Sequence, residues 1–245
     1  MSNEQLIYGT RAVIEAVNAG KDIEKIFIQK GINNNLVNEL RQLLAKNNIP
    51  FQVVPDFKLN KLTKGNHQGV VCILSAITYY KTEDIIPLVF ERGEVPLFLM
   101  IDRVTDVRNV GAMARTAACA GVHAIIIPDQ GSAQLNADAI KTSAGALHNI
   151  PVCREKNLKL TIEYLKGSGI KIVAATEKAS QPYFASDLKV PCCIIMGSEE
   201  SGIAPEYLKR ADEKVLIPMI TAVQSLNVSV AAGIILFEAF RQRNN

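Results

Sequence analysis

The chain has 245 residues, of which 48% are hydrophobic and 21% are charged, a composition typical of a globular protein with a substantial core. No apolar run approaches the roughly 20 residues that a membrane-spanning helix needs, which argues against such a helix. The net charge of +3 is too small to indicate a nucleic-acid partner by itself.

The amino terminus and the cysteines favour a cytoplasmic protein. Met1–Gln5 has neither the basic nor the apolar stretch of a secretory signal. The five cysteines include no CxxC pair, so we expect them to be reduced and mostly buried. The three histidines are scattered, and no metal site is predicted.

Residues 1–76 predict a small α/β domain. Its expected elements are a helix over 11–19, a strand over 25–29, a helix over 34–47, a strand over 51–54, a short helix from Asp56 and a strand over 70–74. Lys and Arg outnumber Asp and Glu by 9 to 6 in residues 1–80, whereas the rest of the chain holds 18 of each. An RNA-binding surface or an ordinary solvated face explains this excess equally well.

Lys64, His67 and Gln68 lie in a seven-residue loop, 63–69, that also contains two glycines. Glycine lets a backbone approach a ligand closely, and a lysine can contact a phosphate. The loop is therefore a candidate RNA-binding segment, with a plain polar turn as the alternative.

Residues 77–95 predict a linker that contains a short helix. From residue 96 onward strands and helices alternate, which is typical of a mostly parallel sheet with helices on both faces. The predicted strands are continuous apolar runs, as expected in a sheet covered on both sides; they span residues 97–101, 124–127, 171–175, 192–196 and 215–217.

The first of three polar junctions follows strand 97–101. Asn109 is expected near the N-cap of the next helix, over 110–120, with Arg115 one to two turns later. Helix starts favour anions, and a guanidinium offers paired donors to a phosphate or carboxylate. A surface arginine paired with Asp102 or Asp106 is the alternative.

The second junction, residues 197–202, follows strand 192–196 and has a glycine at each end. Glycines permit a tight turn and a close backbone approach to a ligand. The carboxylate of Glu199 could orient an arginine, accept hydrogen bonds from ribose hydroxyls or simply be hydrated. The segment lacks the GxGxxG spacing, so a dinucleotide-binding fold is poorly supported.

The third junction joins Ile217 and Pro218 to Ser225, Asn227 and Ser229 at the start of a long helix. Ser225 or Asn227 alone would suffice as a helix cap. Parallel strands end at the same edge of a sheet, where α/β proteins bind ligands. We therefore expect the three junctions to meet.

Together the three junctions resemble the motifs of the SpoU class of RNA 2′-O-ribose methyltransferases, TrmH-like members of the SPOUT superfamily. The matching residues are Asn109-Val110-Gly111 with Arg115-Thr116-Ala117, Met196-Gly197-Ser198-Glu199, and Ile217-Pro218-Met219 with the segment from Ser225 to Ala231. Tyr8-Gly9 and His67-Gln68-Gly69 are similar to the substrate-binding domain of the branch that methylates a guanosine of 23S ribosomal RNA.

The resemblance implies an RNA-binding domain over 1–76 and, over 96–245, an α/β trefoil-knot methyltransferase domain with a mostly parallel sheet. It implies a homodimer through the C-terminal knot helices, and the predicted helix 227–241 is apolar nearly all round, as such a helix should be. It also implies S-adenosylmethionine as the cofactor, held by Met196, Gly197, Ser198, Ile217, Pro218, Ser225 and Leu226.

For catalysis the resemblance gives the key role to Arg115, with Asn109, Glu199 and Asn227 orienting it and the ribose. A guanidinium stays protonated in proteins, so we expect Arg115 to hold the RNA phosphate rather than to act as a base. Lys64, His67 and Gln68 are the expected RNA contacts of the first domain.

Two other functions stay open. The same chemistry could act on transfer RNA or on another ribosomal RNA site, although the transfer-RNA branch lacks the first domain. The chain could also be a non-catalytic RNA-binding factor in ribosome assembly. Intact motifs argue against the second alternative.

Overall fold

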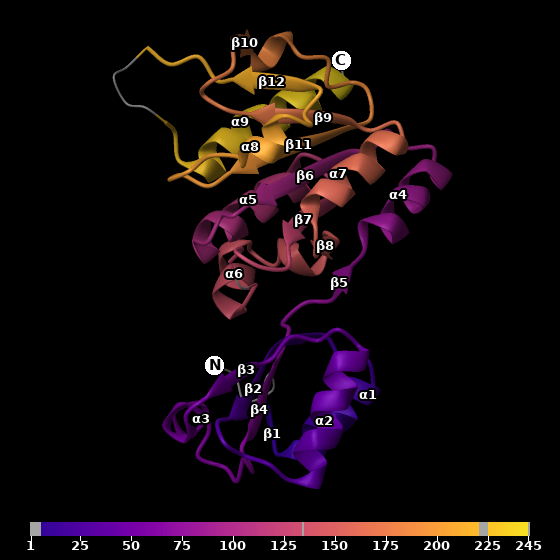
Figure 1. The fold of residues 1–245 in the computed structure, drawn as a ribbon. Helices are drawn as coiled ribbons and strands as arrows, with labels where there is room; N and C mark the ends of the chain where they lie inside the picture. Colours follow the sequence, from indigo (N-terminus) through magenta and orange to yellow (C-terminus); the bar gives the residue numbers. More distant parts are fainter. Residues whose placement is uncertain (1–5, 134, 221–224, 245) are drawn as a thin grey trace. The chain divides into compact units, whose positions relative to one another are not determined.

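The computed structural model describes residues 6–133, 135–220 and 225–244. The chain divides into two compact units, Met1–Ile77 and Thr78–Asn245 (Figure 1). Met1–Gln5, where no secretory signal is expected, lies outside the described residues. Within the described ranges, no helix is long and apolar enough to cross a membrane, and no three His, Cys, Asp or Glu side chains are grouped so that they could hold a metal ion.

Unit 1 is a four-stranded sheet with helices on both faces. Its strand order is β1-β4-β2-β3, with β2 parallel to β3 and antiparallel to β4. The elements are β1 (Leu6–Tyr8), α1 (Thr10–Asn18), β2 (Ile23–Gln29), α2 (Asn35–Lys46), β3 (Gln52–Val54), α3 (Asp56–Leu62) and β4 (Val70–Leu74). Each of the predicted elements is present within two residues of its expected bounds.

Alternating side chains along β2 decide which helix covers which face of this sheet. Ile26 and Ile28 pack with α1 and α2, whereas Phe27 packs on the opposite face against Leu59 of α3. All four side chains are nearly or fully buried. Figure 1 shows α1 and α2 together on one side of the sheet and α3 on the other. A period of two in the sequence thus produces two separate cores.

Unit 2 contains an eight-stranded sheet in the order β10-β12-β9-β11-β6-β7-β8-β5, and every pairing in it is parallel. Its strands are β5 (Tyr79–Tyr80), β6 (Leu97–Asp102), β7 (Ala124–Pro128), β8 (Val152–Glu155), β9 (Lys171–Ala175), β10 (Gln181–Pro182), β11 (Cys192–Gly197) and β12 (Glu213–Leu216). The expected α/β fold with a mostly parallel sheet is confirmed. Strands β5, β8 and β10 were not predicted.

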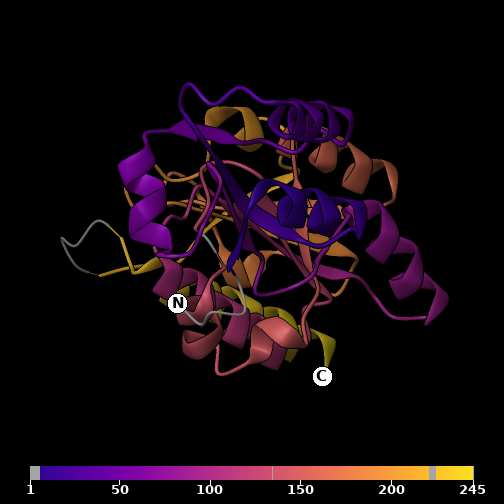
Figure 2. The same ribbon diagram turned by 90° about the horizontal axis from the view of Figure 1, so that it is seen from below.

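Helices cover both faces of this sheet. The helical segments are α4 (Thr82–Glu91), α5 (Val107–Cys119), α6 (Ala137–Thr142), α7 (Leu158–Gly167), α8 (Pro205–Leu208) and α9 (Val228–Arg243), with short 3-10 turns at Ala146–His148 and Tyr183–Ala185. α4, α7 and α8 share one core with the sheet. α5 packs against both α6 and α9, and Figure 2 shows these three helices gathered together.

Residues 77–95 were predicted to form a linker, but from Thr78 onward they belong to unit 2 and contribute β5 and α4 to it. β5 pairs with β8, and α4 buries Ile85, Ile86 and Val89 in the core. The carboxylate of Glu155 on β8 accepts hydrogen bonds from the backbone N–H and hydroxyl of Thr82, each at 2.8 Å. A negative charge beside a helix start also interacts favourably with the helix dipole.

Arg243, the last residue of α9, binds backbone at the amino-terminal ends of two central strands. Its guanidinium donates to the carbonyl oxygens of Val95 at 2.7 Å, Pro96 at 3.0 Å, Leu188 at 2.8 Å and Val190 at 2.8 Å. A planar guanidinium has enough donors to satisfy all four acceptors. The end of α9 is thereby fixed to the segments that lead into β6 and β11.

The cysteines provide a test of this packing. All five are unpaired, and only Cys119 is exposed. Burial raises the pKa of Cys72 and of Cys153 to about 12, so these thiols stay protonated at neutral pH. We expect no more than one thiol of the native protein to react rapidly with a thiol reagent, and five in denaturant. Cys119→Ser should abolish the rapid reaction; a second rapidly reacting thiol would contradict the fold.

Candidate functional site

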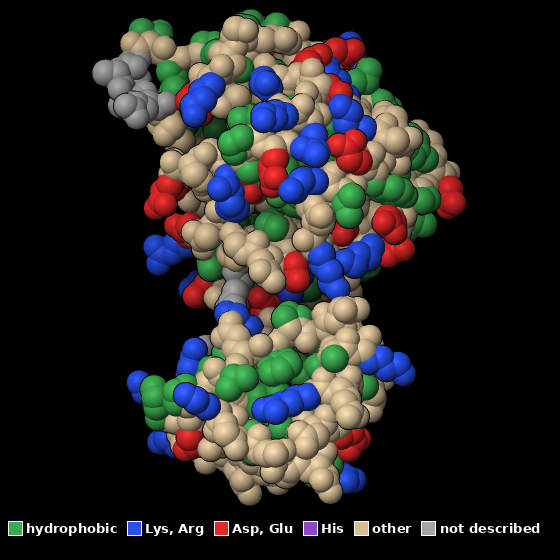
Figure 3. All heavy atoms as spheres, in the orientation of Figure 1, with side chains coloured by type: hydrophobic (Ala, Val, Ile, Leu, Met, Phe, Trp, Pro, Cys, Tyr) green, Lys and Arg blue, Asp and Glu red, His purple; other side chains and the backbone are tan. Residues whose placement is uncertain are grey.

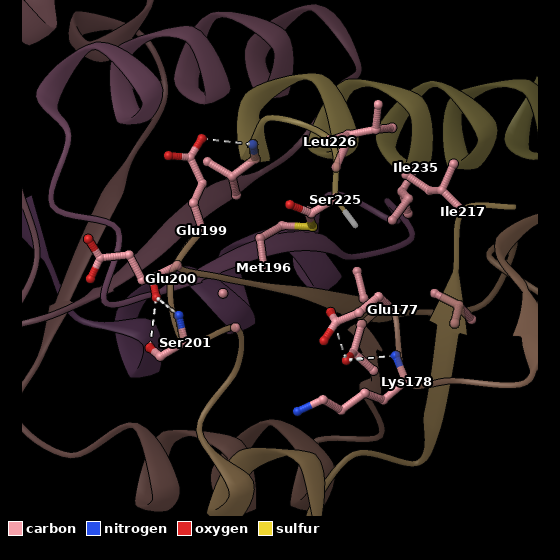
Figure 4. A pocket seen from close by; sticks show the side chains of 18 of the residues that line it. Glu177, Lys178, Met196, Glu199, Glu200, Ser201, Ile217, Ser225, Leu226 and Ile235 are labelled. Atoms are coloured by element: carbon pink, nitrogen blue, oxygen red, sulfur yellow. Dashed lines mark hydrogen bonds between the residues drawn. The ribbon is translucent and has the colours of Figure 1, made fainter. Parts of the chain in front are cut away.

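A cavity of about 410 Å³ lies at the carboxyl ends of β9, β11 and β12, beside the start of α9 (Figure 4). Pockets for small molecules usually measure about 300–1,000 Å³. Six of the seven residues expected to contact a cofactor line this cavity: Met196, Gly197, Ser198, Ile217, Ser225 and Leu226. Pro218, the seventh, is not among the residues that line it.

One wall of the cavity was not anticipated from the sequence. Thr176, Glu177 and Lys178, directly after β9, line the cavity. Figure 4 shows Glu177 and Lys178 across the cavity from Ser225 and Leu226. β9 lies beside β11 in the sheet, so its carboxyl end falls at the same edge. The position of these residues after a buried parallel strand was the available signal.

Gly197 allows the loop after β11 to close on itself. A Cβ atom at this position would lie 2.2 Å from the backbone carbon of Gly202, which is too close for any residue other than glycine. Gly202 has a φ of +61° and donates its N–H to the carbonyl oxygen of Ser198 at 2.9 Å. The hydroxyl of Ser198 also accepts from the N–H of Ser201 at 3.1 Å. The loop that carries Glu199 is therefore tightly turned.

Glu199 joins the three predicted junctions through one carboxylate oxygen. Its Oε1 accepts from Nδ2 of Asn109 at 3.1 Å, from Nδ2 of Asn227 at 2.7 Å and from the backbone N–H of Val228 at 3.3 Å. Nδ2 of Asn227 also donates to Oδ1 of Asn109 at 3.0 Å. The prediction that the three junctions meet is borne out by these contacts.

Asn227 also caps α9. Its Oδ1 accepts from the N–H of Ser229 at 2.9 Å and from the Ser229 hydroxyl at 2.6 Å. The prediction that Ser225 or Asn227 caps this helix is confirmed for Asn227. One side chain therefore begins the helix and connects it to Glu199.

The start of α5 was predicted too late. The helix begins at Val107, and Asp106 caps it by accepting from the N–H of Arg108 at 2.7 Å. Asn109 therefore lies within the first turn rather than near the cap, and it is buried. This placement directs its amide toward Glu199.

Arg115 does not join this network. It is exposed, and among the described residues it makes no hydrogen bond or ion pair. The alternative pairing with Asp102 or Asp106 does not occur either, because Asp102 binds Arg103 instead. Arg115 lies six residues after Asn109, about 9 Å further along the helix. Its guanidinium is free to meet a ligand from outside.

In unit 1 the loop 63–69 presents Lys64 and Gln68 to solvent, while His67 is buried. Nδ1 of His67 accepts from the N–H of Gly69 at 3.0 Å, and Nε2 lies 3.2 Å from Oδ1 of Asn60. His67 thus stabilises the turn from which Lys64 and Gln68 extend into solvent.

Two family models match the chain. Residues 96–237 match the SpoU rRNA methylase family, and residues 6–80 match the RNA 2′-O ribose methyltransferase substrate-binding family. The chain is 35% identical over 243 residues to the 23S rRNA (guanosine-2′-O-)-methyltransferase RlmB of Photorhabdus laumondii, covering 98% of this chain and 99% of that protein. It is 34% identical over 238 residues to YacO of Bacillus subtilis, named as a TrmH family tRNA/rRNA methyltransferase, covering 97% and 96%.

Solved structures share the fold. The AdoMet-bound rRNA methyltransferase of Sinorhizobium meliloti aligns over 97% of this chain and 87% of its own, with 26% identity and a TM-score of 0.62. The SpoU methyltransferase AviRb of Streptomyces viridochromogenes, in complex with AdoMet, aligns over 98% and 90%, with 24% identity and a TM-score of 0.63. With both family models and full-length relatives in agreement, the chain belongs to the SpoU family of RNA methyltransferases.

Proposed function

We propose that this protein methylates the ribose 2′-hydroxyl of a guanosine in 23S ribosomal RNA, with S-adenosylmethionine as methyl donor. The observation that carries the proposal is the convergence of Asn109, Glu199 and Asn227 beside the cavity. The relative from Photorhabdus laumondii, named for a 23S rRNA guanosine, supports the choice of substrate.

The cavity suits S-adenosylmethionine in size and chemistry. Its lining combines apolar side chains such as Met196, Ile217 and Leu226 with the polar groups of Ser198 and Ser225. A ligand with both apolar and polar groups needs a lining of this kind. These residues and the backbone of the loop at Gly197 would hold the molecule, which when bound supplies a methyl group already activated on a sulfonium sulfur.

The protein's task is then to align the ribose and to exclude other geometries. Orientation of reactants can contribute roughly 7–11 kcal/mol in the best cases. All three donors at Glu199 converge on Oε1, and among the described residues Oε2 has no hydrogen bond. Oε2 is thus available to accept from a ribose hydroxyl, while Asn109 and Asn227 hold the carboxylate still.

Arg115 is proposed to bind the RNA phosphate next to the target nucleotide. Its exposure and lack of an acidic partner in the described parts of the chain leave the guanidinium ready for an anion. A guanidinium keeps its proton in proteins, so this residue positions the RNA and does not remove the 2′-hydroxyl proton.

Unit 1 is proposed to bind a part of the RNA that is distant from the methylated ribose. Lys64 and Gln68 are its expected contacts, since both side chains are exposed on one loop. His67 stabilises the loop that carries them through its hydrogen bonds with Gly69 and Asn60. A lysine contact to phosphate adds affinity without sequence preference.

We further propose that the enzyme is a cytoplasmic homodimer with a trefoil knot in unit 2. Support for the dimer comes from α9, where Val230, Phe237 and Phe240 remain between 42% and 51% exposed although the helix also has a buried face. Large apolar side chains grouped on an exposed helix often mark an interface. The five unpaired cysteines fit a reducing compartment.

The substrate can be identified directly. Purified protein with methyl-labelled S-adenosylmethionine should label 23S ribosomal RNA taken from a strain in which the gene is deleted, at one guanosine ribose. Mapping of ribose methylation should show that same position lost in the deletion strain. Labelling of transfer RNA instead would assign the enzyme to the alternative substrate. Failure to bind S-adenosylmethionine in calorimetry would favour the assembly-factor alternative.

Arg115→Ala should lower methyl transfer about 10- to 150-fold, the loss expected for a hydrogen-bonded charge. The matched control is Arg108→Ala, which removes an exposed arginine two turns earlier on the same helix. Melting temperatures of both variants should equal that of the parent protein. Normal turnover by Arg115→Ala would refute the phosphate-binding role.

Glu199→Gln should reduce turnover about tenfold or more, because the uncharged amide holds Asn109, Asn227 and the ribose less firmly. Glu200→Gln changes the next residue in the same way and tests whether any charge loss in this loop has the effect, since Glu200 also lines the cavity but is outside the hydrogen-bond network. Parent-like turnover by Glu199→Gln would remove Glu199 from the catalytic site.

A further inference from the structure

Arg103 follows β6 directly and has a backbone conformation that is unusual for its residue type. Its φ is +56°, in the left-handed region that side chains other than glycine adopt rarely. Such conformations persist where the surrounding contacts enforce them, and they cluster near functional sites. The contacts of this arginine therefore need a physical explanation.

The side chain of Arg103 forms a fork around the buried carboxylate of Asp102. Nε donates to Oδ1 at 3.0 Å and Nη2 donates to Oδ2 at 3.2 Å. The Asp102 side chain is only 2% exposed, so its charge needs these partners. The pKa of Arg103 is raised, chiefly by this hydrogen bond to Asp102, so the guanidinium keeps its charge.

Both members of the pair also bind the segment that follows the Glu199 loop. Nη2 of Arg103 donates to the carbonyl oxygen of Gly202 at 3.2 Å. Oδ2 of Asp102 accepts from the N–H of Ala204 at 2.7 Å. Between these two contacts Ile203 is buried in the core of unit 2. One ion pair thus fixes the chain on both sides of Ile203.

This segment is the downstream end of the loop that builds the cavity wall. The upstream end is Gly197, which lies opposite Asp102 in the pairing of β11 with β6. Ser198 and Gly202 close the loop between these ends. The position of Glu199 is therefore set by a turn whose two ends both rest on residues at the end of β6.

We propose that Arg103 is a positioning residue of the methyltransferase site, which together with Asp102 holds the loop of residues 198–201 in the shape that binds S-adenosylmethionine and presents Glu199. Arg103 acts through the loop and is not itself a catalytic residue. The proposal rests on the proposed function, but its binding step requires no RNA.

Arg103→Gly is the most informative variant. Glycine adopts a φ of +56° without strain, so the backbone can stay in place while the fork is lost. Arg103→Lys keeps the positive charge but not the bidentate geometry. We expect both variants to raise the Kd of S-adenosylmethionine, measured by calorimetry without RNA, and its KM in the RNA assay by about tenfold.

The matched control is Lys166→Ala. Lys166 pairs with Asp212 at 2.7 Å and donates to the carbonyl oxygen of Arg210 at 3.0 Å, while Asp212 accepts from the N–H of Ile172. This arrangement repeats the pattern at Arg103 without touching the loop. Lys166→Ala should leave the Kd of S-adenosylmethionine unchanged even where its melting temperature falls.

A double-mutant cycle separates positioning from general stability. If Arg103 acts through Glu199, Arg103→Gly should reduce kcat much less in the Glu199→Gln background than in the parent protein. Additive effects on kcat, or an unchanged Kd in both Arg103 variants, would overturn the proposal. If the parent protein binds S-adenosylmethionine but methylates no RNA, the proposed function fails while the calorimetric result for Arg103 still stands.

Discussion

The parallel pairing of β6 with β11 is the constraint on which the site depends. Gly197 lies opposite Asp102, so the two strands end at the same level. The chain after β6 leads to Asn109, and the chain after β11 leads to Glu199, which brings two distant segments within hydrogen-bond distance. A shift of one residue in this register would separate them by about 3.3 Å and turn the side chains to the other face.

Asparagine is suited to the position it occupies at the start of α9. An amide both donates and accepts, so Asn227 can cap the helix through Oδ1 and bind Glu199 through Nδ2. A serine could cap but would have no second arm of this length. The direction of α9 and the orientation of the carboxylate are therefore coupled through one side chain.

Much of the fold could be predicted from sequence because buried parallel strands are continuous apolar runs. The apolar stretch 192–196 identifies β11, although it cannot reveal that β11 lies between β6 and β9. That order depends on long-range pairing, which local patterns do not contain. The strand Val152–Glu155 was missed because its apolar run is only two residues long: Val152 and Cys153 are buried, and the next two residues are charged.

The site was predictable to a similar degree. Asn109, Glu199 and Asn227 stand out as polar residues that follow strands. The family resemblance predicted that these three residues belong to one site. The start of α5 was misplaced because Asp106 competes as a cap with Asn109, and both are good caps. Thr176, Glu177 and Lys178 were overlooked because no glycine or asparagine marks the end of β9. Arg103 gave no signal at all, since its role depends on a backbone angle.

The contact of Arg243 with four carbonyl oxygens has a consequence for how the enzyme is made. α9 is synthesised after every strand of the sheet, yet it supplies Asn227 to the site and is fixed in place by its own last residue. A nascent chain that still lacks this helix also lacks Val228, Ala231 and Ile235, which line the cavity. The cavity is therefore complete only after α9 has been synthesised and has packed against α5.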